Sequence, residues 1–313
     1  MQTIPAFTAL RGIYAPVLTP FDADLQPDAV RFVAHCRWLV EHGARLAVFG
    51  TNSEAASLSL DERLRLTDAV LEAGVLPDAM LPGTGACALS DAVTLTRHAD
   101  RAGVAGVLVL PPFYYTPASD DGLFAFYAEL IERVGSARLR LLLYHIPQLT
   151  GVPISTALVA RLRARYPDTV VGLKDSSGDW SYSHALLERF GPEGFAVFPA
   201  SESLLSRGLA LGAAGCISAT VNLNPHGIRA LFDGWDGPQG TALQASADAL
   251  RQAVQPLPMI ATMKQVLARA RDDADWARVR PPLVALEQPR TDALLAALHG
   301  QDFAMPGLGA LGR

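Results

Sequence analysis

Lysine is scarce in this chain, and its scarcity makes the two lysines candidates for chemistry. The sequence contains only Lys174 and Lys264, beside 24 arginines. Arginine keeps its proton in proteins, whereas a lysine can become an amine nucleophile once burial lowers its pKa. Such an amine can form a covalent imine, or Schiff base, with a carbonyl compound. The alternative is that the count reflects composition bias alone.

The surroundings of the two lysines differ. Lys174 ends an apolar run, residues 170–174, that is typical of a buried strand, and a polar turn with a glycine, residues 175–179, follows it. A Schiff-base lysine would be placed at such a strand end, although an ordinary strand-end charge fits the same pattern. Lys264 falls in an amphipathic C-terminal segment, and we expect it on a solvated helix face.

Two other segments carry polar groups of a suitable kind. Residues 50–54 read Gly-Thr-Asn-Ser-Glu, a tight turn whose hydroxyl, amide and backbone donors could hold an anion such as a carboxylate, or could simply cap a helix. Residues 144–151 begin with Tyr144 at the end of an apolar run. A tyrosine there could transfer a proton through a neighbouring hydroxyl, or could sit at the edge of the core with its hydroxyl in water.

Short apolar runs alternate with longer amphipathic segments along most of the chain. Most of the runs are continuous and rich in valine and leucine, as in a parallel sheet covered by helices. The strand candidates are residues 12–18, 45–49, 79–82, 106–110, 139–144, 170–174, 196–199 and 215–218. The helix candidates are residues 28–41, 63–73, 90–102, 121–134, 155–165, 180–189, 203–211, 225–232, 239–253, 258–270 and 291–298.

Eight strand candidates in this alternation predict an α/β fold, a (β/α)8 TIM barrel with a C-terminal helical extension. A doubly wound sheet is the structural rival, but it would usually place a glycine-rich turn after the first strand, where residues 19–22 read Thr-Pro-Phe-Asp. We expect the barrel and its active site in residues 1–224. The extension, residues 225–313, is expected to pack on the barrel.

Composition excludes several other classes of protein. The net charge of −5 offers no basic surface for nucleic acid, and no apolar stretch approaches the length of a membrane span. The N-terminus lacks the pattern of a signal peptide, and three widely spaced cysteines suit the reduced cytoplasm. The seven histidines show no ligand spacing with cysteines or carboxylates, so we expect no metal.

The three polar segments together resemble one family. Residues 50–54, 144–151 and 172–178 resemble, in order, the motifs of the class I pyruvate aldolases that include N-acetylneuraminate lyase and dihydrodipicolinate synthase. Those motifs are G-[ST]-[TN]-x-E, Y-N-[IV]-P-x-x-[TS]-G and G-[IVL]-K-[DEQ]-x-[ST]-G. Three motifs in register are far more specific than any single one, and the resemblance extends from about residue 12 to residue 222.

The resemblance implies a role for each matching residue. Lys174 would form the Schiff base with the keto carbon of pyruvate or another 2-keto acid, which needs no further cofactor. Tyr144 would transfer protons above the imine, with Thr51 as relay, while Thr51 and Asn52 would hold the substrate carboxylate. Tyr114 matches a tyrosine that reaches the site of a neighbouring subunit, and the family suggests a homotetramer, a dimer of dimers.

Departures from the family pattern bear on the substrate. Leu149 stands where dihydrodipicolinate synthases have an arginine for the acceptor's carboxylate, which points to a neutral or sugar-like acceptor. His145 replaces an asparagine, with no clear effect. Further substrate contacts are implied after strands six to eight, where Glu202 could accept hydrogen bonds from substrate hydroxyls or stabilise a helix N-terminus. The candidate residues there are Ser176, Ser201, Glu202, Ile217 and Asn222. Ile217 would pack beside the imine.

The predicted function is therefore a lyase that reversibly cleaves or forms a 2-keto acid, a 4-hydroxy-2-keto or sugar-derived acid, with pyruvate and an aldehyde as partners. Three alternatives remain open. They are the 4-hydroxy-tetrahydrodipicolinate synthase reaction, dehydration of a keto-deoxy sugar acid, and a binding or sensor protein without activity. The aldehyde, the direction and the stereochemistry do not follow from the sequence.

Overall fold

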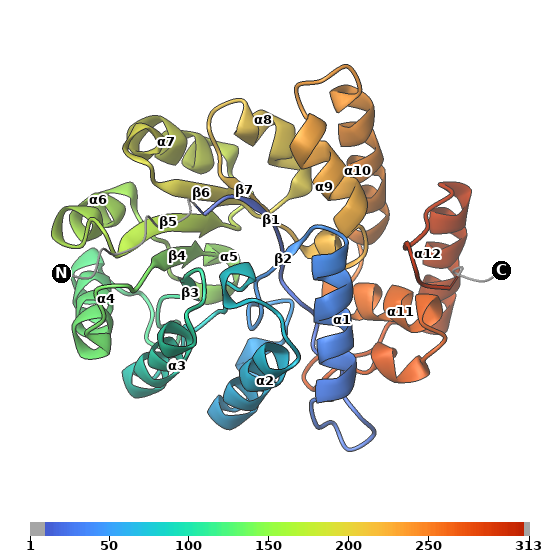
Figure 1. The fold of residues 1–313 in the computed structure, drawn as a ribbon, viewed down its shortest axis with the longest axis horizontal. Helices are drawn as coiled ribbons and strands as arrows, with labels where there is room; N and C mark the ends of the chain where they lie inside the picture. Colours follow the sequence, from blue (N-terminus) through green and yellow to red (C-terminus); the bar gives the residue numbers. More distant parts are fainter. Residues whose placement is uncertain (1–9, 310–313) are drawn as a thin grey trace.

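Short parallel strands form a central ring that helices surround on the outside (Figure 1). The computed structural model describes residues 10–309. Valine, leucine and isoleucine dominate the strands because one face of each meets the helices and the other fills the interior. The strands are β1 (Gly12–Ala15), β2 (Arg45–Leu46), β3 (Val107–Val109), β4 (Leu141–His145), β5 (Val170–Asp175), β6 (Ala196–Pro199) and β7 (Gly215–Ile217).

The ring closes through a segment that is not itself a regular strand. Hydrogen bonding joins β2, β1 and β7 in one group and β3 to β6 in another. Between β2 and β3, isolated parallel bridges pair Met80 with Leu46 and Gly83 with Leu108. The amide of Ala214 donates to the carbonyl of Val197, which links β7 to β6. The predicted third strand, residues 79–82, is thus a bridging segment after a 3-10 turn, and the (β/α)8 barrel is confirmed.

The helices follow their capping residues closely. Asp28, Ser119 and Ser155 accept hydrogen bonds at helix N-termini, and Ser59 forms a capping box with Glu62. The α-helices are α1 (Ala29–Glu41), α2 (Leu60–Glu72), α3 (Leu89–Ala102), α4 (Asp120–Val134), α5 (Pro147–Thr150), α6 (Thr156–Arg165), α7 (Trp180–Phe190), α8 (Leu205–Leu209), α9 (Pro225–Gly234), α10 (Gly240–Val254), α11 (Met259–Ala270) and α12 (Gln288–Gly300). The 3-10 helices are η1 (Ala55–Ser57), η2 (Pro77–Ala79), η3 (Gly191–Glu193), η4 (Glu202–Leu204), η5 (Ala219–Asn222) and η6 (Ala274–Ala277).

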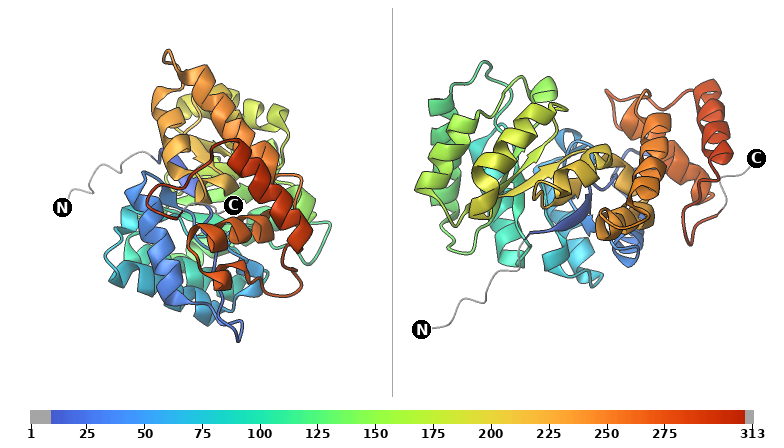
Figure 2. Two further views of the ribbon diagram at one scale, coloured as in Figure 1. Left: turned by 90° about the vertical axis from the view of Figure 1, so that its right-hand side faces the viewer. Right: turned by 90° about the horizontal axis from the view of Figure 1, so that it is seen from above.

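Helices α10, α11 and α12 lie together beyond one end of the barrel (Figure 2). Their buried side chains, among them Leu250, Val266 and Leu294, belong to the same hydrophobic cluster as Leu39 of α1. Helix α9 packs on β1 and on α10, so it connects the barrel with these helices. We keep the division into residues 1–224 and 225–313 as a proposal.

Lys264 contradicts the prediction of a solvated helix face. Its side chain is fully buried on α11, and its ammonium forms an ion pair with the carboxylate of Glu54, which is also fully buried. The ammonium also donates to the carbonyl of Arg278 at 2.7 Å. Burial lowers the pKa of Lys264 to about 8, although the Glu54 carboxylate favours the charged form. The amphipathic pattern failed here because the residue's polar partner comes from a loop 210 residues earlier in the sequence.

Arg280 makes a second link between the extension and the barrel. Its amide donates to Glu54 at 2.9 Å, and its guanidinium forms two hydrogen bonds with Glu62 of α2, at 2.6 and 2.9 Å. This paired geometry holds the pKa of Glu62 at about 2. Through Lys264 and Arg280, helix α11 and the residues that follow it hold Glu54 and so fix the loop of residues 50–54.

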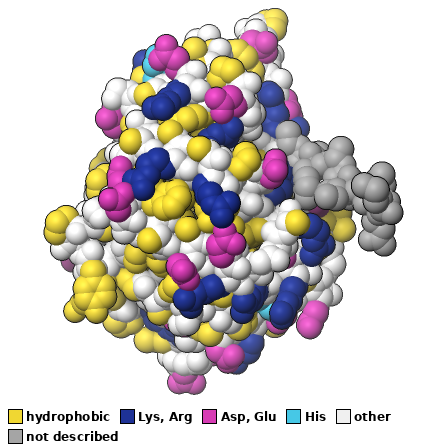
Figure 3. Space-filling view, turned by 90° about the vertical axis from the view of Figure 1, so that its left-hand side faces the viewer, with side chains coloured by type: hydrophobic (Ala, Val, Ile, Leu, Met, Phe, Trp, Pro, Cys, Tyr) yellow, Lys and Arg dark blue, Asp and Glu magenta, His cyan; other side chains and the backbone are white. Residues whose placement is uncertain are grey.

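Charged side chains of both signs lie on one face of the molecule. On the face shown in Figure 3, basic and acidic side chains are interspersed, and neither sign gathers into one patch. No helix within residues 10–309 combines the length and the hydropathy that a membrane span requires.

We predict that Lys264→Met lowers the free energy of unfolding by about 3–5 kcal/mol, because the Glu54 carboxylate stays buried without its cation. The double variant with Glu54→Gln should lose less, since no charge is then left unpaired. Arg65→Met, at a surface arginine with a 68% exposed side chain, is the control and should change stability by less than about 0.5 kcal/mol. Urea unfolding measures all three, and equal losses for Lys264→Met and Arg65→Met would contradict the prediction.

Candidate active site

The barrel places Lys174 and Tyr144 side by side. They are directly paired in the parallel register of β5 and β4, so their side chains point into the barrel from neighbouring strands. The Lys174 amine lies 4.1 Å from the centre of the Tyr144 ring, and the two residues are 2% exposed. Gly172 allows this arrangement, because a Cβ there would lie 2.4 Å from the carbonyl oxygen of Ala196 on β6.

Thr51 reaches the same point from the loop after β2. Its hydroxyl oxygen lies 2.9 Å from the hydroxyl oxygen of Tyr144, and either group can donate. Residues 93 positions apart thus share one hydrogen bond at the carboxyl end of the barrel, where barrel enzymes hold their substrates. The pair provides a continuous path for a proton between two hydroxyls.

The environment of Tyr144 favours its ionisation. Burial alone raises the pKa of its phenol, but the charge of Lys174 and hydrogen bonding from Thr51, Lys174 and Ser176 outweigh burial. The net pKa is therefore below the usual value of tyrosine. A phenol with a lowered pKa next to an amine is a suitable general base.

The loop of residues 50–54 is bent so that its amides are available. Phe49 and Glu54, at its two ends, have left-handed backbones with φ of 60° and 56°. Within the described residues, the amides of Thr51 and Asn52 donate to no acceptor. Gly83 lets the loop approach, since a Cβ there would lie 2.2 Å from the carbonyl oxygen of Phe49. Free amides in a tight turn can bind an anion.

Hydrogen bonds explain the positions of two residues beside the site, His145 and Asp175. His145 is buried, and its Nδ1 accepts the amide of Ile154 at 3.1 Å, which requires a ring nitrogen without a proton. Burial lowers its pKa against the opposing effect of Asp175. Asp175 accepts from the Ser177 amide and the Ser183 hydroxyl, at 2.9 and 2.6 Å, and so shapes the turn after Lys174.

Ser176 and Ser201 face one small polar cavity of about 80 Å³ beside Asp175. Arg251 of α10 also lines it, a residue that sequence reasoning missed because its helix lies outside the motifs. Glu202 is fully buried below this cavity, where its carboxylate accepts hydrogen bonds from Ser218 and Thr220.

Arg251 also donates to Glu202, at 3.3 Å. Three partners thus occupy the Glu202 carboxylate, and a bond to a substrate hydroxyl would have to displace one of them. We propose that Glu202 supports the turn after β6 and holds Arg251 in place.

Asn222 and Ile217 are deeply buried. The amide group of Asn222 donates to the carbonyls of Pro16 and Ala219 at 3.0 Å and accepts from the amide of Leu18 at 3.1 Å. Its side chain therefore ties η5 to the end of β1, and we propose a supporting role for it. Ile217 is 1% exposed and packs among the apolar side chains in the barrel interior, with Phe198 of β6.

Leu149 and Tyr114 lie at the open end of the site. Leu149 is 65% exposed and lines a cavity of about 370 Å³ together with Thr51. Tyr114 is 76% exposed in the loop after β3, and its only ring contact in the described chain is with Tyr115. The structure thus brings together Lys174, Tyr144, Thr51 and Ser176, and leaves Tyr114 apart from them.

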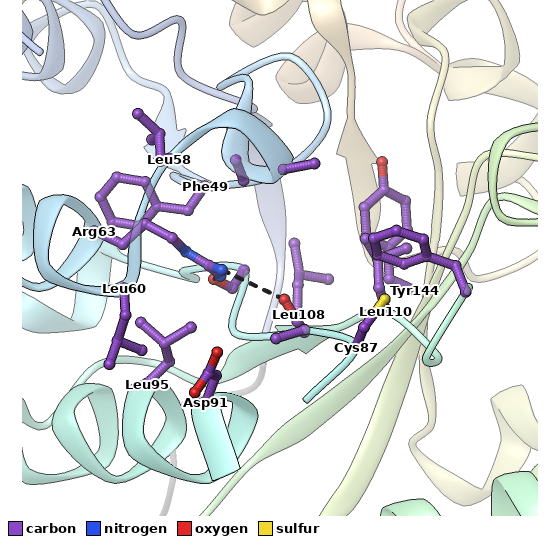
Figure 4. Close-up of a pocket in the computed structure, with 16 residues that line it drawn as sticks. Phe49, Leu58, Leu60, Arg63, Cys87, Asp91, Leu95, Leu108, Leu110 and Tyr144 are labelled. Carbon is purple, nitrogen blue, oxygen red and sulfur yellow. Dashed lines mark hydrogen bonds between the residues drawn. The ribbon is translucent and has the colours of Figure 1, made fainter. Parts of the chain in front are cut away.

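A third cavity, of about 200 Å³, lies on the other side of the loop of residues 50–54 (Figure 4). Tyr144 lines one side of it and Arg63 of α2 the other. Arg63 is buried and donates to the carbonyl of Gly83 at 2.6 Å, so its guanidinium supports the backbone of the segment that contains Gly83. Among residues 10–309, no group of three or more histidine, cysteine or acidic side chains could hold a metal ion.

Residues 9–301 match the dihydrodipicolinate synthetase family. The chain belongs to this family. It is 37% identical over 291 residues to an uncharacterized DapA-like lyase of Chloroflexus aurantiacus, a match that covers 92% of this chain and 95% of the relative.

Solved structures agree with the family assignment. Dihydrodipicolinate synthase from Agrobacterium tumefaciens has a TM-score of 0.85 at 32% identity, and the match covers 93% of this chain and 99% of that one. YagE, a prophage protein of the same family from E. coli K12 solved in complex with pyruvate, has a TM-score of 0.86 at 25% identity over 95% and 100% of the two chains. The protein is thus a lyase of the dihydrodipicolinate synthetase family, as the three motifs indicated.

We predict that ultraviolet titration of the protein detects one tyrosine, Tyr144, whose phenol ionises below the ordinary tyrosine pKa of about 10. Tyr144→Phe should remove that component, and Lys174→Met should move it to higher pH, because the cation that stabilises the phenolate is lost. Tyr115→Phe removes an exposed phenol and should leave the component in place. Identical titration curves for the wild type and Tyr144→Phe would contradict the prediction.

Proposed function

We propose that this protein is a class I aldolase that forms a Schiff base on Lys174 and reversibly cleaves a 4-hydroxy-2-keto acid into pyruvate and an aldehyde. The observation that carries the proposal is the buried Lys174 amine, 4.1 Å from the ring of Tyr144, whose hydroxyl is bonded to Thr51. An amine nucleophile, a general base and a second hydroxyl are the groups that this reaction requires.

The chemistry follows from these groups. The Lys174 amine attacks the keto carbon, and loss of water leaves a protonated imine. Tyr144 then takes the proton of the 4-hydroxyl, the C3–C4 bond breaks, and its electron pair moves into the imine to give an enamine. The aldehyde leaves, C3 takes up a proton, and water releases pyruvate from the lysine. The lowered pKa of Tyr144 makes this proton transfer easier than it would be for an ordinary tyrosine.

The loop after β2 is suited to the keto-acid end of the substrate. The free amides of Thr51 and Asn52 can donate to its carboxylate, with the Thr51 hydroxyl beside them. The pyruvate complex of YagE supports pyruvate as one partner. The reaction needs no cofactor beyond the covalent imine.

The proposal extends to the assembly and the compartment of the enzyme. An exposed Tyr114 is compatible with its predicted part in the site of a neighbouring subunit, and so with a homotetramer. The three cysteines are unpaired, which suits an enzyme of the reduced cytoplasm.

A second candidate is the 4-hydroxy-tetrahydrodipicolinate synthase reaction. It is favoured by the 38% identity, over 71% of this chain and 73% of the relative, to the synthase of Thermus thermophilus. Leu149 disfavours it, because an exposed leucine offers no cation for the acceptor's carboxylate. Dehydration of a keto-deoxy sugar acid uses the same imine and remains a further alternative.

Product analysis distinguishes these reactions. With pyruvate and a panel of aldehydes, the proposal predicts aldol adducts by mass spectrometry, and with a 4-hydroxy-2-keto acid it predicts pyruvate release. Turnover should fall by at least about 10³-fold in Lys174→Arg, which keeps the charge but lacks the nucleophile. Arg65→Met, at a surface arginine with a 68% exposed side chain, keeps Lys174 and is the control that should retain aldol activity.

Other outcomes would contradict the proposal. Aspartate semialdehyde as the preferred acceptor of the wild type would indicate the synthase reaction. Loss of water from a keto-deoxy sugar acid without loss of carbon would indicate a dehydratase. Normal turnover by Lys174→Arg would exclude the imine mechanism altogether.

A further inference from the structure

The cavity beside Thr51 has an apolar lining, which no motif of the sequence predicted. Its volume of about 370 Å³ lies in the range of small-molecule sites. Two parts of the chain supply its larger apolar side chains. The loops after β3 and β4 contribute Phe113, Ile146 and Leu149, and the extension contributes Ile260, Pro282 and Leu283.

The cavity offers no free charge to a substrate. Among its described lining residues, Glu54 alone is ionisable, and its carboxylate is fully buried and paired with Lys264 and the amide of Arg280. No lysine or arginine lines the cavity. A sugar-derived or carboxylated chain would therefore lose its hydration there without recovering hydrogen bonds of equal strength.

The position of the cavity indicates which part of a substrate would occupy it. The reacting carbons must lie between the Lys174 amine and the bonded hydroxyls of Tyr144 and Thr51. The carboxylate of the substrate would bind to the amides of the loop of residues 50–54. The substituent on C4 must then extend from the reaction centre in another direction. Thr51 lines the apolar cavity, which therefore begins at that centre.

The other two cavities at the site are smaller and more polar. The cavity beside Ser176 has a volume of about 80 Å³, and the cavity between Tyr144 and Arg63 has a volume of about 200 Å³. Charged side chains line both, since Asp175 and Arg251 line the first and Arg63 lines the second. An apolar C4 substituent of more than a few atoms is therefore best accommodated in the apolar cavity.

We propose that the acceptor is an aldehyde with an apolar tail, aliphatic or aromatic, and that this tail binds in the cavity lined by Leu149, Ile260 and Leu283. The substrate class is then a 4-hydroxy-2-keto acid with an apolar C4 substituent, in place of the sugar-like acceptor expected from the sequence. The inference rests on the proposed aldolase function and specifies its substrate.

The test compares benzaldehyde with glyceraldehyde as acceptors for pyruvate. The wild type should show a kcat/KM for benzaldehyde at least about tenfold higher, because each apolar group buried in a fitting pocket adds about that factor. Leu283→Ser should lower kcat/KM for benzaldehyde by about tenfold and leave that for glyceraldehyde within about twofold. Val284→Ser, at a 79% exposed neighbour that does not line the cavity, is the matched control and should change neither.

Imine formation on Lys174 and the oligomeric state of the protein are measured on the same samples. The inference can then fail separately from the proposed function. Trapping of pyruvate on Lys174 should be equal in the wild type and both variants. A preference for glyceraldehyde, absence of benzaldehyde turnover, or an equal loss for both aldehydes in Leu283→Ser would overturn the inference while trapping still supports the imine. A change of oligomeric state in Leu283→Ser would also overturn it, since a second copy would then cover the cavity. Failure to trap pyruvate in the wild type would overturn the proposed function itself.

Discussion

The parallel pairing of β4 with β5 is the constraint on which the site depends. It sets Tyr144 opposite Lys174, so that a buried amine is partnered by an aromatic ring and by a hydroxyl. A charged lysine without such partners would be costly in the interior. The same proximity lowers the pKa of the phenol, because the cation favours the phenolate. One register of two strands therefore brings the proposed nucleophile, Lys174, and the proposed base, Tyr144, together. A shift by a single residue would turn one of the two side chains toward the helices.

The extension takes part in building this site. The ion pair of Lys264 with Glu54 and the bonds of Arg280 join residues after β7 to the loop that holds Thr51. Both charges of the pair are fully buried, so loss of either partner would leave an unpaired charge in the interior beside the loop. The same part of the chain supplies Ile260 and Leu283 to the apolar cavity. The C-terminal helices thus help to position the loop that carries Thr51, and they shape the space beside it.

The sequence could predict the fold and the central residues because their signals are local. Lys174 and Tyr144 end apolar runs, and Gly172, which permits close strand contact, stands within the same motif as Lys174. Lys264 could not be placed, because its partner is remote and an amphipathic pattern cannot distinguish a solvated face from one buried by a distant loop. The hydrogen bond from Arg251 to Glu202 could not be predicted either, because it depends on how α10 packs. Long-range pairs of polar groups require the folded geometry.

The central claim is that Lys174 forms an imine with pyruvate, and intact-mass spectrometry after borohydride reduction tests it most directly. The account predicts a single reduced pyruvate adduct on the wild type, located by peptide mapping on the fragment that contains Lys174. The adduct should be absent from Lys174→Arg, which keeps the charge but has no amine able to react. Lys264, buried in its ion pair, should remain unmodified in both proteins. An adduct on Lys264, or none in the wild type, would contradict the account.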